Sequence, residues 1–202
     1  MMMRTADPHS PTKARLLDTA ERLMLAQGFA ATTVDEICAA AKLTKGSFFH
    51  YFESKDDLCE TLLTRFCEHS AQRHQAAIGR ETDPLKRVFG HVDLAIKMSK
   101  ECAGSRGCLL GTFAQEMADT NPTIRSICAE AFGRWAASLR KDLDQAKAAH
   151  PPKIPVDTKS LAEHFIAVLE GSQILAKVNQ DAAIIEKSLK HFKNYLKAVF
   201  GK

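Results

Sequence analysis

Hydrophobic positions recur at helical spacing along nearly the whole chain. The first such segment is predicted to form a helix that ends before Gly28, and its apolar face consists of Leu16, Leu17, Ala20, Leu23 and Met24. The next segment has the i, i+3, i+4, i+7 pattern of a short helix, formed by Val34, Ile37, Cys38 and Ala41. A capping box from Thr33 to Glu36 marks its start. Thr44 is the predicted N-cap of another short helix, which follows almost at once.

The rest of the chain continues this pattern. Ser54 and the residues after it cap a long helix, and further helices are predicted near 84–100, 106–118, 122–148, 158–178 and 182–199. Prolines at the first helical position support several starts, for example after Asp83 and after Asn121. Strand-like alternation is absent from the sequence. The expected fold is all-α with about nine helices, divided into residues 1–55 and residues 56–202.

Three short helices within the first 53 residues match a helix-turn-helix. The third is too short to be stable alone, so Phe48 and Phe52 should anchor it to the other two. The face left free is suited to reading DNA, because hydroxyls, a lysine and aromatic polar groups can contact base edges and phosphates. It comprises Thr44, Lys45, Ser47, His50 and Tyr51. The alternative is a small helical domain whose polar face only meets water.

Backbone features also favour contact with a polyanion. The helices begun by Thr33 and by Ser54-Lys55 present N-termini at which unpaired N–H groups and the helix dipole attract phosphate. Gly46 costs about 1 kcal/mol relative to alanine inside a helix, which is understandable if the backbone approaches another surface closely. The net charge of +4, from 28 Lys and Arg against 24 Asp and Glu, is weak evidence in itself. From Lys42 to Lys55, however, three lysines oppose one acid, Glu53.

The composition narrows the class of protein further. At 202 residues, 45% hydrophobic and 26% charged, the chain is globular and can bury a core. No apolar run approaches the roughly 18–20 residues of a membrane span. The six cysteines lack metal-ligand or paired CxxC spacing, so we expect reduced thiols in a cytoplasm and no metal or cofactor.

The stretches TTVDEI (32–37) and LTKGSFFHYFESKDDL (43–58) resemble the DNA-binding motif of the Tet repressor family. The resemblance covers about 45 residues, from Arg15 to Leu58. It implies an all-α homodimer that binds a palindromic operator, with a recognition helix from Thr44 to His50. The DNA contacts that it implies fall on Thr33, Thr44, Lys45, Gly46, Ser47, His50, Tyr51 and Lys55.

Two positions depart from the family pattern. Family members usually have tyrosine where this chain has Phe49, so one phosphate-directed hydroxyl is missing. They favour glycine in the turn where Lys42 stands. We expect Lys42 to supply a replacement phosphate contact, provided that the backbone there accommodates a side chain.

The last two helices are candidates for dimerisation. The segment 158–178 is apolar on two faces, and the final helix carries a seam suited to helix packing. The resemblance implies a four-helix interface made by these helices and their symmetry mates. Its candidate residues are Phe165, Leu169, Ser172, Leu175, Leu189, Phe192 and Leu196. The alternative is that both helices cover one monomer's core.

Family resemblance also implies a regulatory pocket enclosed by residues 84–148. Candidate lining residues are Phe66, Phe89, Phe113, Met117 and Trp135, although most apolar residues of such a set are ordinary core. Cys108 is a candidate sensor, because a position near a helix N-terminus and beside Arg106 favours the thiolate. Residues 107–111, with Glu170-Gly171-Ser172 and Lys177, are similar to a subgroup that responds to electrophiles and oxidants through a cysteine. A buried structural cysteine is the alternative.

These observations predict a homodimeric transcriptional repressor released from its operator by a small-molecule inducer or by modification of Cys108. Two other classes remain open at this point. An all-helical thiol enzyme could use Cys108 as a nucleophile, but no base and orienting group can be singled out for it. A helical adaptor or lipid carrier would leave the 44–58 segment unexplained.

Overall fold

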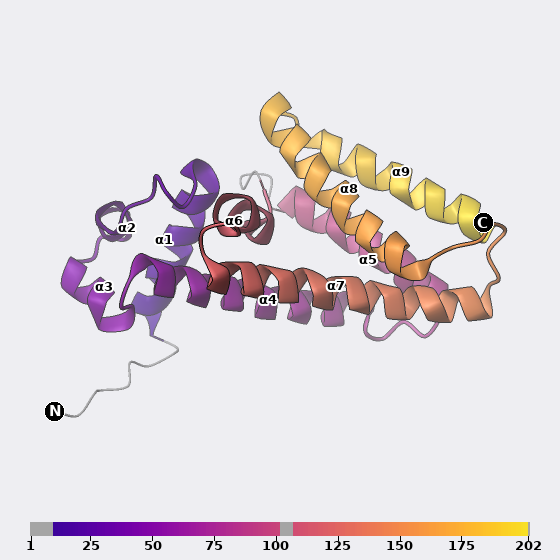
Figure 1. Ribbon diagram of the computed structural model, residues 1–202, viewed down its shortest axis with the longest axis horizontal. Helices are drawn as coiled ribbons and strands as arrows, with labels where there is room; N and C mark the ends of the chain where they lie inside the picture. Colours follow the sequence, from indigo (N-terminus) through magenta and orange to yellow (C-terminus); the bar gives the residue numbers. More distant parts are fainter. Residues whose placement is uncertain (1–9, 102–106, 202) are drawn as a thin grey trace. The chain divides into compact units, whose positions relative to one another are not determined.

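The computed structural model describes residues 10–101 and 107–201, and in these ranges the chain is helical with no strand (Figure 1). An all-α fold was expected, and the structure confirms it. The described helices are α1 (Pro11–Gln27), α2 (Val34–Ala41), α3 (Lys45–Tyr51), α4 (Lys55–Ile78), α5 (Pro84–Glu101), α6 (Leu109–Met117), α7 (Pro122–Ala149), α8 (Thr158–Asn179) and α9 (Ala183–Phe200).

Local signals explain where the first helices start and stop. Pro11 opens α1, and Gly28 ends it with a φ of 89°, a conformation that glycine adopts without steric cost. The capping box predicted at Thr33 is present, with Glu36 as its second member. α2 ends at Lys42, which lies in the left-handed region with a φ of 54°. The turn therefore takes lysine in a conformation more common for glycine.

The described residues form two compact units. The first unit comprises the described part of Met1–Phe66 together with Leu109–Ile127, and the second that of Cys67–Cys108 and Cys128–Lys202. The chain thus enters the second unit within α4, returns to the first at α6 and leaves it again within α7. Helix α6 therefore packs with the N-terminal helices, although it follows α5 in the sequence.

The core of the first unit is built from all its helices. α1 packs on α2, α3 and α6, and α2 packs on α3. Phe48 and Phe52 are buried, as expected for the residues that anchor α3, with ring centroids 5.5 Å apart. On α6, Phe113 is fully buried and meets Phe29 edge-on at 6.2 Å. Arg65 of α4 forms an ion pair with Asp18 of α1 at 2.8 Å.

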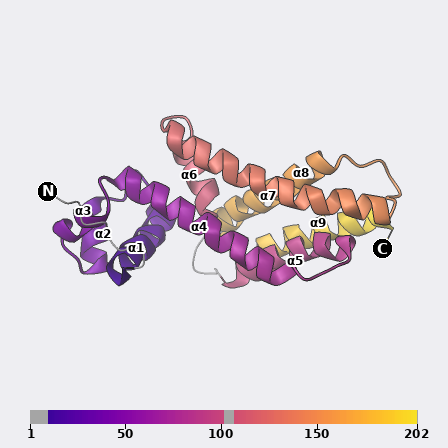
Figure 2. The ribbon, with the colours of Figure 1, turned by 90° about the horizontal axis from the view of Figure 1, so that it is seen from below.

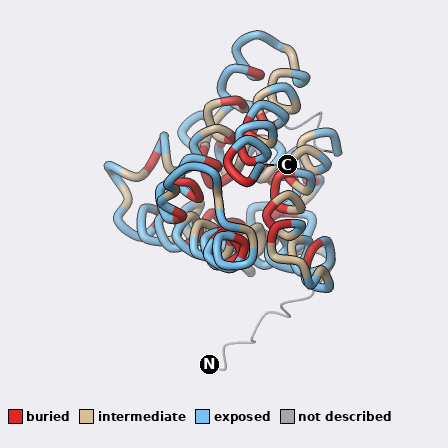
Figure 3. The backbone as a smooth tube through the Cα atoms, turned by 90° about the vertical axis from the view of Figure 1, so that its right-hand side faces the viewer, coloured by how far each residue is buried: buried red, intermediate tan, exposed pale blue. Residues whose placement is uncertain are grey.

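In the second unit, α8 and α9 lie side by side and α5 packs on α9 (Figures 1 and 2). Phe165 and Phe192 bring their rings to 5.4 Å between α8 and α9, and Trp135 of α7 meets Phe165 edge-on at 5.8 Å. Figure 3 shows buried positions interspersed with exposed ones on helical turns, as amphipathic packing requires. None of the described helices is long and apolar enough to cross a membrane.

Candidate nucleic-acid interface

Helix α3 presents a polar face beside its buried phenylalanines. The Thr44 hydroxyl caps the helix by accepting a hydrogen bond from the backbone N–H of Ser47, at 3.1 Å. The two hydroxyls of Thr44 and Ser47 also lie 3.0 Å apart. Thr44, Lys45, Gly46 and His50 are exposed, and Ser47 is half-buried. The structure thus brings five of the predicted DNA contacts together on one short helix and its cap.

Lys45 forms an exposed ion pair on this face. Its ammonium pairs with Asp35 of α2 at 2.8 Å, and this hydrogen bond raises the pKa of Lys45. Both side chains are more than half exposed. Because an ion pair between exposed side chains is weak, a DNA phosphate can compete with Asp35 for the ammonium.

Nothing in the described part of the chain requires glycine at position 46 for steric reasons. A Cβ built at this position would meet only Thr44 Oγ1, at 3.6 Å, which is ordinary contact distance. Alanine would therefore fit the free protein and favour the helix. The close approach of DNA to the backbone at Gly46 stays a prediction.

The N-terminus of α2 is satisfied by its own capping box. Thr33 Oγ1 accepts from the Glu36 N–H at 3.2 Å, and Glu36 accepts from the Thr33 N–H at 2.8 Å and from its hydroxyl at 2.9 Å. These bonds to Thr33 lower the pKa of the Glu36 carboxyl. Thr33 and Lys42 are both exposed at opposite ends of α2, so either can reach a phosphate.

Two predicted contacts have structural partners instead. The Tyr51 hydroxyl lies 2.8 Å from the Ser10 hydroxyl, at the start of α1. Lys55 points into the unit, where its ammonium donates to the carbonyl oxygens of Phe29 and Thr32, both at 2.8 Å. Sequence reasoning placed Lys55 on a phosphate because it stands at a helix N-terminus. The structure uses two of its three donors on the chain itself, so a contact of Lys55 with DNA stays a prediction.

The candidate pocket residues fall in both units. Phe66, Phe113 and Met117 belong to the first unit, where Phe113 and Met117 are core residues. Phe89 and Trp135 pack against the core of the second unit. A regulatory pocket lined by these residues stays a prediction.

Cys108 directly precedes α6 and is half-buried in the second unit. Its described partner is the carboxyl of Glu170 on α8, to which it is hydrogen-bonded. Burial raises the pKa of Glu170, and the bond to Cys108 opposes that rise. Lys177 lies exposed in the last turn of α8, and Arg106 lies outside the described residues. The sequence indicated Glu170 only through the subgroup resemblance.

Three other described thiols lie where burial disfavours the thiolate. Burial raises the pKa of Cys38 and of Cys67, and it raises that of Cys128 to about 11. A higher pKa means a smaller thiolate fraction near neutral pH, and the thiolate is the reactive form.

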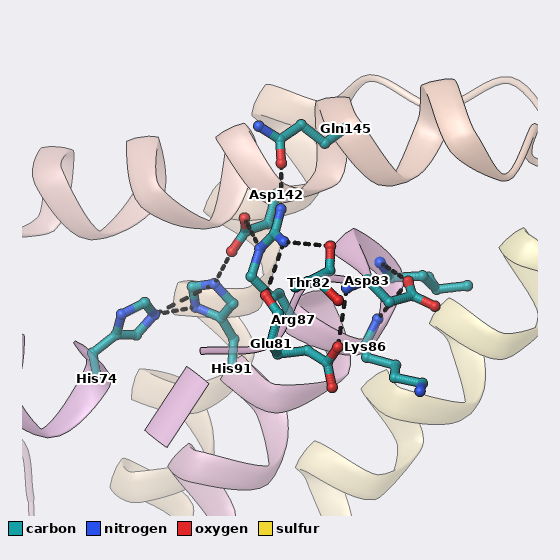
Figure 4. Close-up of polar contacts among 10 residues, drawn as sticks. His74, Glu81, Thr82, Asp83, Lys86, Arg87, His91, Asp142 and Gln145 are labelled. Carbon is teal, nitrogen blue, oxygen red and sulfur yellow. Dashed lines mark hydrogen bonds and ion pairs between the residues drawn. The ribbon is translucent and has the colours of Figure 1, made fainter. Parts of the chain in front are cut away.

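The second unit also contains a buried polar chain that sequence reasoning did not find (Figure 4). His74 Nε2 lies 2.9 Å from His91 Nδ1, and His91 Nε2 lies 2.9 Å from Asp142 Oδ2. Arg87 Nε donates to Asp142 Oδ1 at 2.7 Å. A carboxylate only accepts, so His91 Nε2 donates to it and His74 donates to His91 Nδ1. Burial lowers the pKa of His91 to about 4 and also lowers the pKa of His74, so both rings are neutral near pH 7.

Six of the seven predicted dimer residues are buried within a single chain. Phe165, Leu169, Ser172, Leu189, Phe192 and Leu196 are at most 6% exposed, so they form the core between α8 and its neighbours. Only Leu175 is exposed, at 54%. Apolar spacing alone did not separate the face that packs inside the chain from the face left outside. The exposed large apolar residues of these helices are Ile174, Leu175 and Val178 toward the end of α8 and Tyr195 on α9, whose ring lies beside that of His164; together they are named the α8–α9 patch below.

Family models match both parts of the chain. Residues 16–62 match the model of bacterial regulatory proteins of the tetR family. Residues 84–192, more than half of the chain, match the tetracyclin repressor-like C-terminal domain. The chain belongs to the Tet repressor family.

Individual Tet repressor family members agree with this assignment. The transcriptional repressor NemR of Escherichia coli is 26% identical over 189 residues, which are 92% of this chain and 94% of NemR. The repressor DhaR of a Mycobacterium species is 22% identical over 181 residues, 89% of each chain. The crystal structure of reduced E. coli NemR superposes with a TM-score of 0.78 at 25% identity, covering 92% of this chain and 96% of that one.

The chain is therefore a helix-turn-helix DNA-binding transcriptional regulator, as the sequence predicted. The family implied by residues 32–58 is confirmed. The homologues are transcriptional regulators, and the alternative of a thiol enzyme that uses Cys108 finds no support among them.

Proposed function

We propose that this protein is a homodimeric repressor that binds a palindromic operator through the exposed face of α3. The observation that carries the proposal is the free face itself, on which Thr44, Lys45 and His50 are exposed beside Gly46. NemR and DhaR, its similar relatives, are both repressors. In this proposal residues 1–55 bind DNA, and residues 56–202 form the regulatory and dimerisation part.

Selection of DNA by the protein tests this function directly. The full chain is used to select duplexes from a random-sequence library, and affinity for the selected duplex is measured at several salt concentrations. We expect a palindrome with half-sites about 34–36 Å apart, since a dimer places two recognition helices one DNA turn apart. Affinity should fall steeply with salt because phosphate contacts release counterions. Equal affinity for all duplexes would contradict sequence-specific binding.

A dimer needs an external surface, and the α8–α9 patch supports one. Its members are 45–76% exposed, which is costly for large apolar side chains in water. Helices α8 and α9 also pack on each other within the chain, so each would contribute one face to its own core and another to a symmetry mate. Two copies of these helices form a four-helix contact.

For regulation, we propose that modification of Cys108 releases the repressor from DNA. The hydrogen bond between the thiol and Glu170 gives the thiol proton an acceptor whose raised pKa makes it a stronger base than an ordinary carboxylate. NemR, whose reduced form has been crystallised, is a similar repressor. An activated alkene would then add to Cys108: the S–H bond and the C=C π bond break, Sγ forms a thioether with one carbon, and the thiol proton, accepted first by Glu170, ends on the neighbouring carbon.

Treatment with N-ethylmaleimide tests this regulation. Operator affinity of the wild-type chain should fall after treatment, whereas Cys108→Ser should keep its affinity. Glu170→Gln should slow the alkylation at neutral pH, because the amide is a poor proton acceptor. Equal loss of affinity in Cys108→Ser would show that another thiol is responsible.

Binding of a non-covalent inducer is a second way to release the repressor, and α8 has buried polar groups that could bind one. Glu170 Oε1 and Gln173 Oε1 are buried and, among the described residues, have no hydrogen-bond partner. A small molecule with N–H or O–H donors would satisfy them. Screening with Cys108→Ser separates this route from alkylation, since a compound that raises its melting temperature and weakens operator binding acts without the thiol. Gln173→Leu should reduce both effects.

A further inference from the structure

The connection between α1 and α2 is bound by a carboxylate from α6. Glu116 accepts hydrogen bonds from the backbone N–H groups of Phe29 and Ala30, at 2.7 and 2.8 Å. All three residues lie in the first unit. Hydrogen bonds to an ionised carboxylate are shorter and stronger than bonds between neutral groups. Glu116 therefore fixes the chain four residues before α2 begins.

The same connection is bound from its other side by α4. Lys55 donates to the carbonyl oxygens of Phe29 and Thr32, and its ammonium also lies 4.0 Å from the centre of the Phe29 ring. The N–H groups of the connection thus bind an anion on α6, while its carbonyl groups bind a cation on α4. Both the donors and the acceptors of this stretch of backbone are therefore hydrogen-bonded to charged side chains.

Gly28 makes the approach of Glu116 possible. A Cβ at position 28 would lie 3.1 Å from Glu116 Oε2 and 3.2 Å from Oε1, closer than most side chains tolerate. The φ of 89° at Gly28 is also unfavourable for other residues. The position of the Glu116 carboxylate therefore depends on the absence of a side chain at Gly28.

We propose that Glu116 is a positioning residue for operator binding. The clamped connection leads directly into Thr33, the N-cap of α2, and α2 packs on the recognition helix α3. By fixing Phe29 and Ala30, Glu116 fixes where α2 starts and hence which phosphate Thr33 faces. An acidic side chain improves DNA binding here although its charge repels phosphates.

The negative charge of Glu116 should weaken DNA binding, whereas its positioning of α2 should strengthen binding to the operator, and this difference can be tested. Glu116→Gln removes one negative charge and weakens the clamp, because the amide NH₂ cannot accept a hydrogen bond. Asp119→Asn, at an exposed residue just beyond α6, is the matched control with the same charge change. Affinity is measured for two duplexes, one selected by the wild-type chain from a random-sequence library and one of unrelated sequence.

We expect Glu116→Gln to bind the selected duplex about tenfold more weakly, as the loss of a charge-assisted hydrogen bond implies. Its affinity for the unrelated duplex should stay unchanged or rise, since non-specific binding follows charge. Asp119→Asn should leave both affinities unchanged or slightly higher. Glu116→Gln binding both duplexes like Asp119→Asn would overturn the proposal. A parallel loss for both duplexes would also overturn it, because that result indicates misfolding. If no duplex is selected by the wild type, sequence-specific operator binding itself fails.

Discussion

At position 46, glycine is expected to lower the stability of helix α3 and to allow a closer contact with DNA. Alanine is favoured over glycine in helices by about 1 kcal/mol, and a Cβ at position 46 meets only Thr44 Oγ1. Gly46→Ala should therefore raise the free energy of unfolding by up to about 1 kcal/mol. It should also weaken binding to the selected duplex, because the methyl group occupies space that the DNA backbone needs. Chemical denaturation and a gel shift measure the two effects.

Gly133 in α7 provides the control for this variant. It is exposed, and a Cβ there meets no described atom within 4 Å. Gly133→Ala should stabilise the protein by a similar amount and leave DNA binding unchanged. Equal or tighter DNA binding by Gly46→Ala would remove the argument that DNA approaches the backbone at this position.

His91 is expected to make stability depend on pH. Its pKa is about 4 in the folded chain because burial disfavours the charged ring, against 6.5 in the unfolded chain. Between these values the unfolded chain binds more protons, so the free energy of unfolding increases with pH. The contribution is complete above about pH 6.5 and is lost as the pH falls toward 4. A shift of this size corresponds to about 3 kcal/mol.

Urea unfolding at pH 7.5 and pH 5 measures this dependence. His91→Gln keeps a donor for Asp142 and an acceptor for His74 but does not titrate (Figure 4). The loss of stability between the two pH values should be smaller in this variant than in the wild type. The pKa of His74 is also lowered by burial, so part of the dependence should remain. An unchanged pH difference would show that other groups dominate.

For Gly28→Ala, in the connection between α1 and α2, two causes of destabilisation can be measured separately. Two penalties combine there, the positive φ and the contact of the new methyl group with Glu116. We expect a destabilisation of about 1–2 kcal/mol in the wild-type background. In a Glu116→Ala background only the φ penalty remains, so the same substitution should cost less. A double-mutant cycle on thermal or urea unfolding measures the difference. Additive effects would indicate that the two residues do not interact.

The sequence predicts helix starts well because their signals are local. Pro84 and Pro122 begin α5 and α7, as expected, and Thr44 caps α3. The contact between Glu116 and Phe29 could not be predicted in this way, since 87 residues separate the two. The hydrogen bonds of Lys55 to Phe29 and Thr32 could not be predicted for the same reason. A lysine at a helix start suits a phosphate or a pair of carbonyl groups equally well.

At the scale of the whole molecule, apolar spacing does not predict which helix faces are exposed. The periodicity of α8 and α9 shows that their faces are apolar, but it does not show which face remains outside. Phe165 and Phe192 are buried in one chain, whereas Ile174 and Val178 are 47% and 76% exposed. Which face is external follows from the three-dimensional packing of the core and not from the spacing of apolar residues.

If the α8–α9 patch joins two copies, a charge placed in it should separate them. Leu175→Glu puts a carboxylate into a contact that is apolar in the dimer, where desolvation of the charge is costly. We expect sedimentation equilibrium to show at least tenfold weaker dimerisation. Operator affinity should then depend strongly on protein concentration, because one subunit contacts only one half-site. Ile154→Glu is the matched control, since Ile154 is 48% exposed on the α7–α8 connection, outside the patch. A dimer unaffected by Leu175→Glu would place the symmetry axis on another surface, and the spacing of the operator half-sites would then have to follow from that surface.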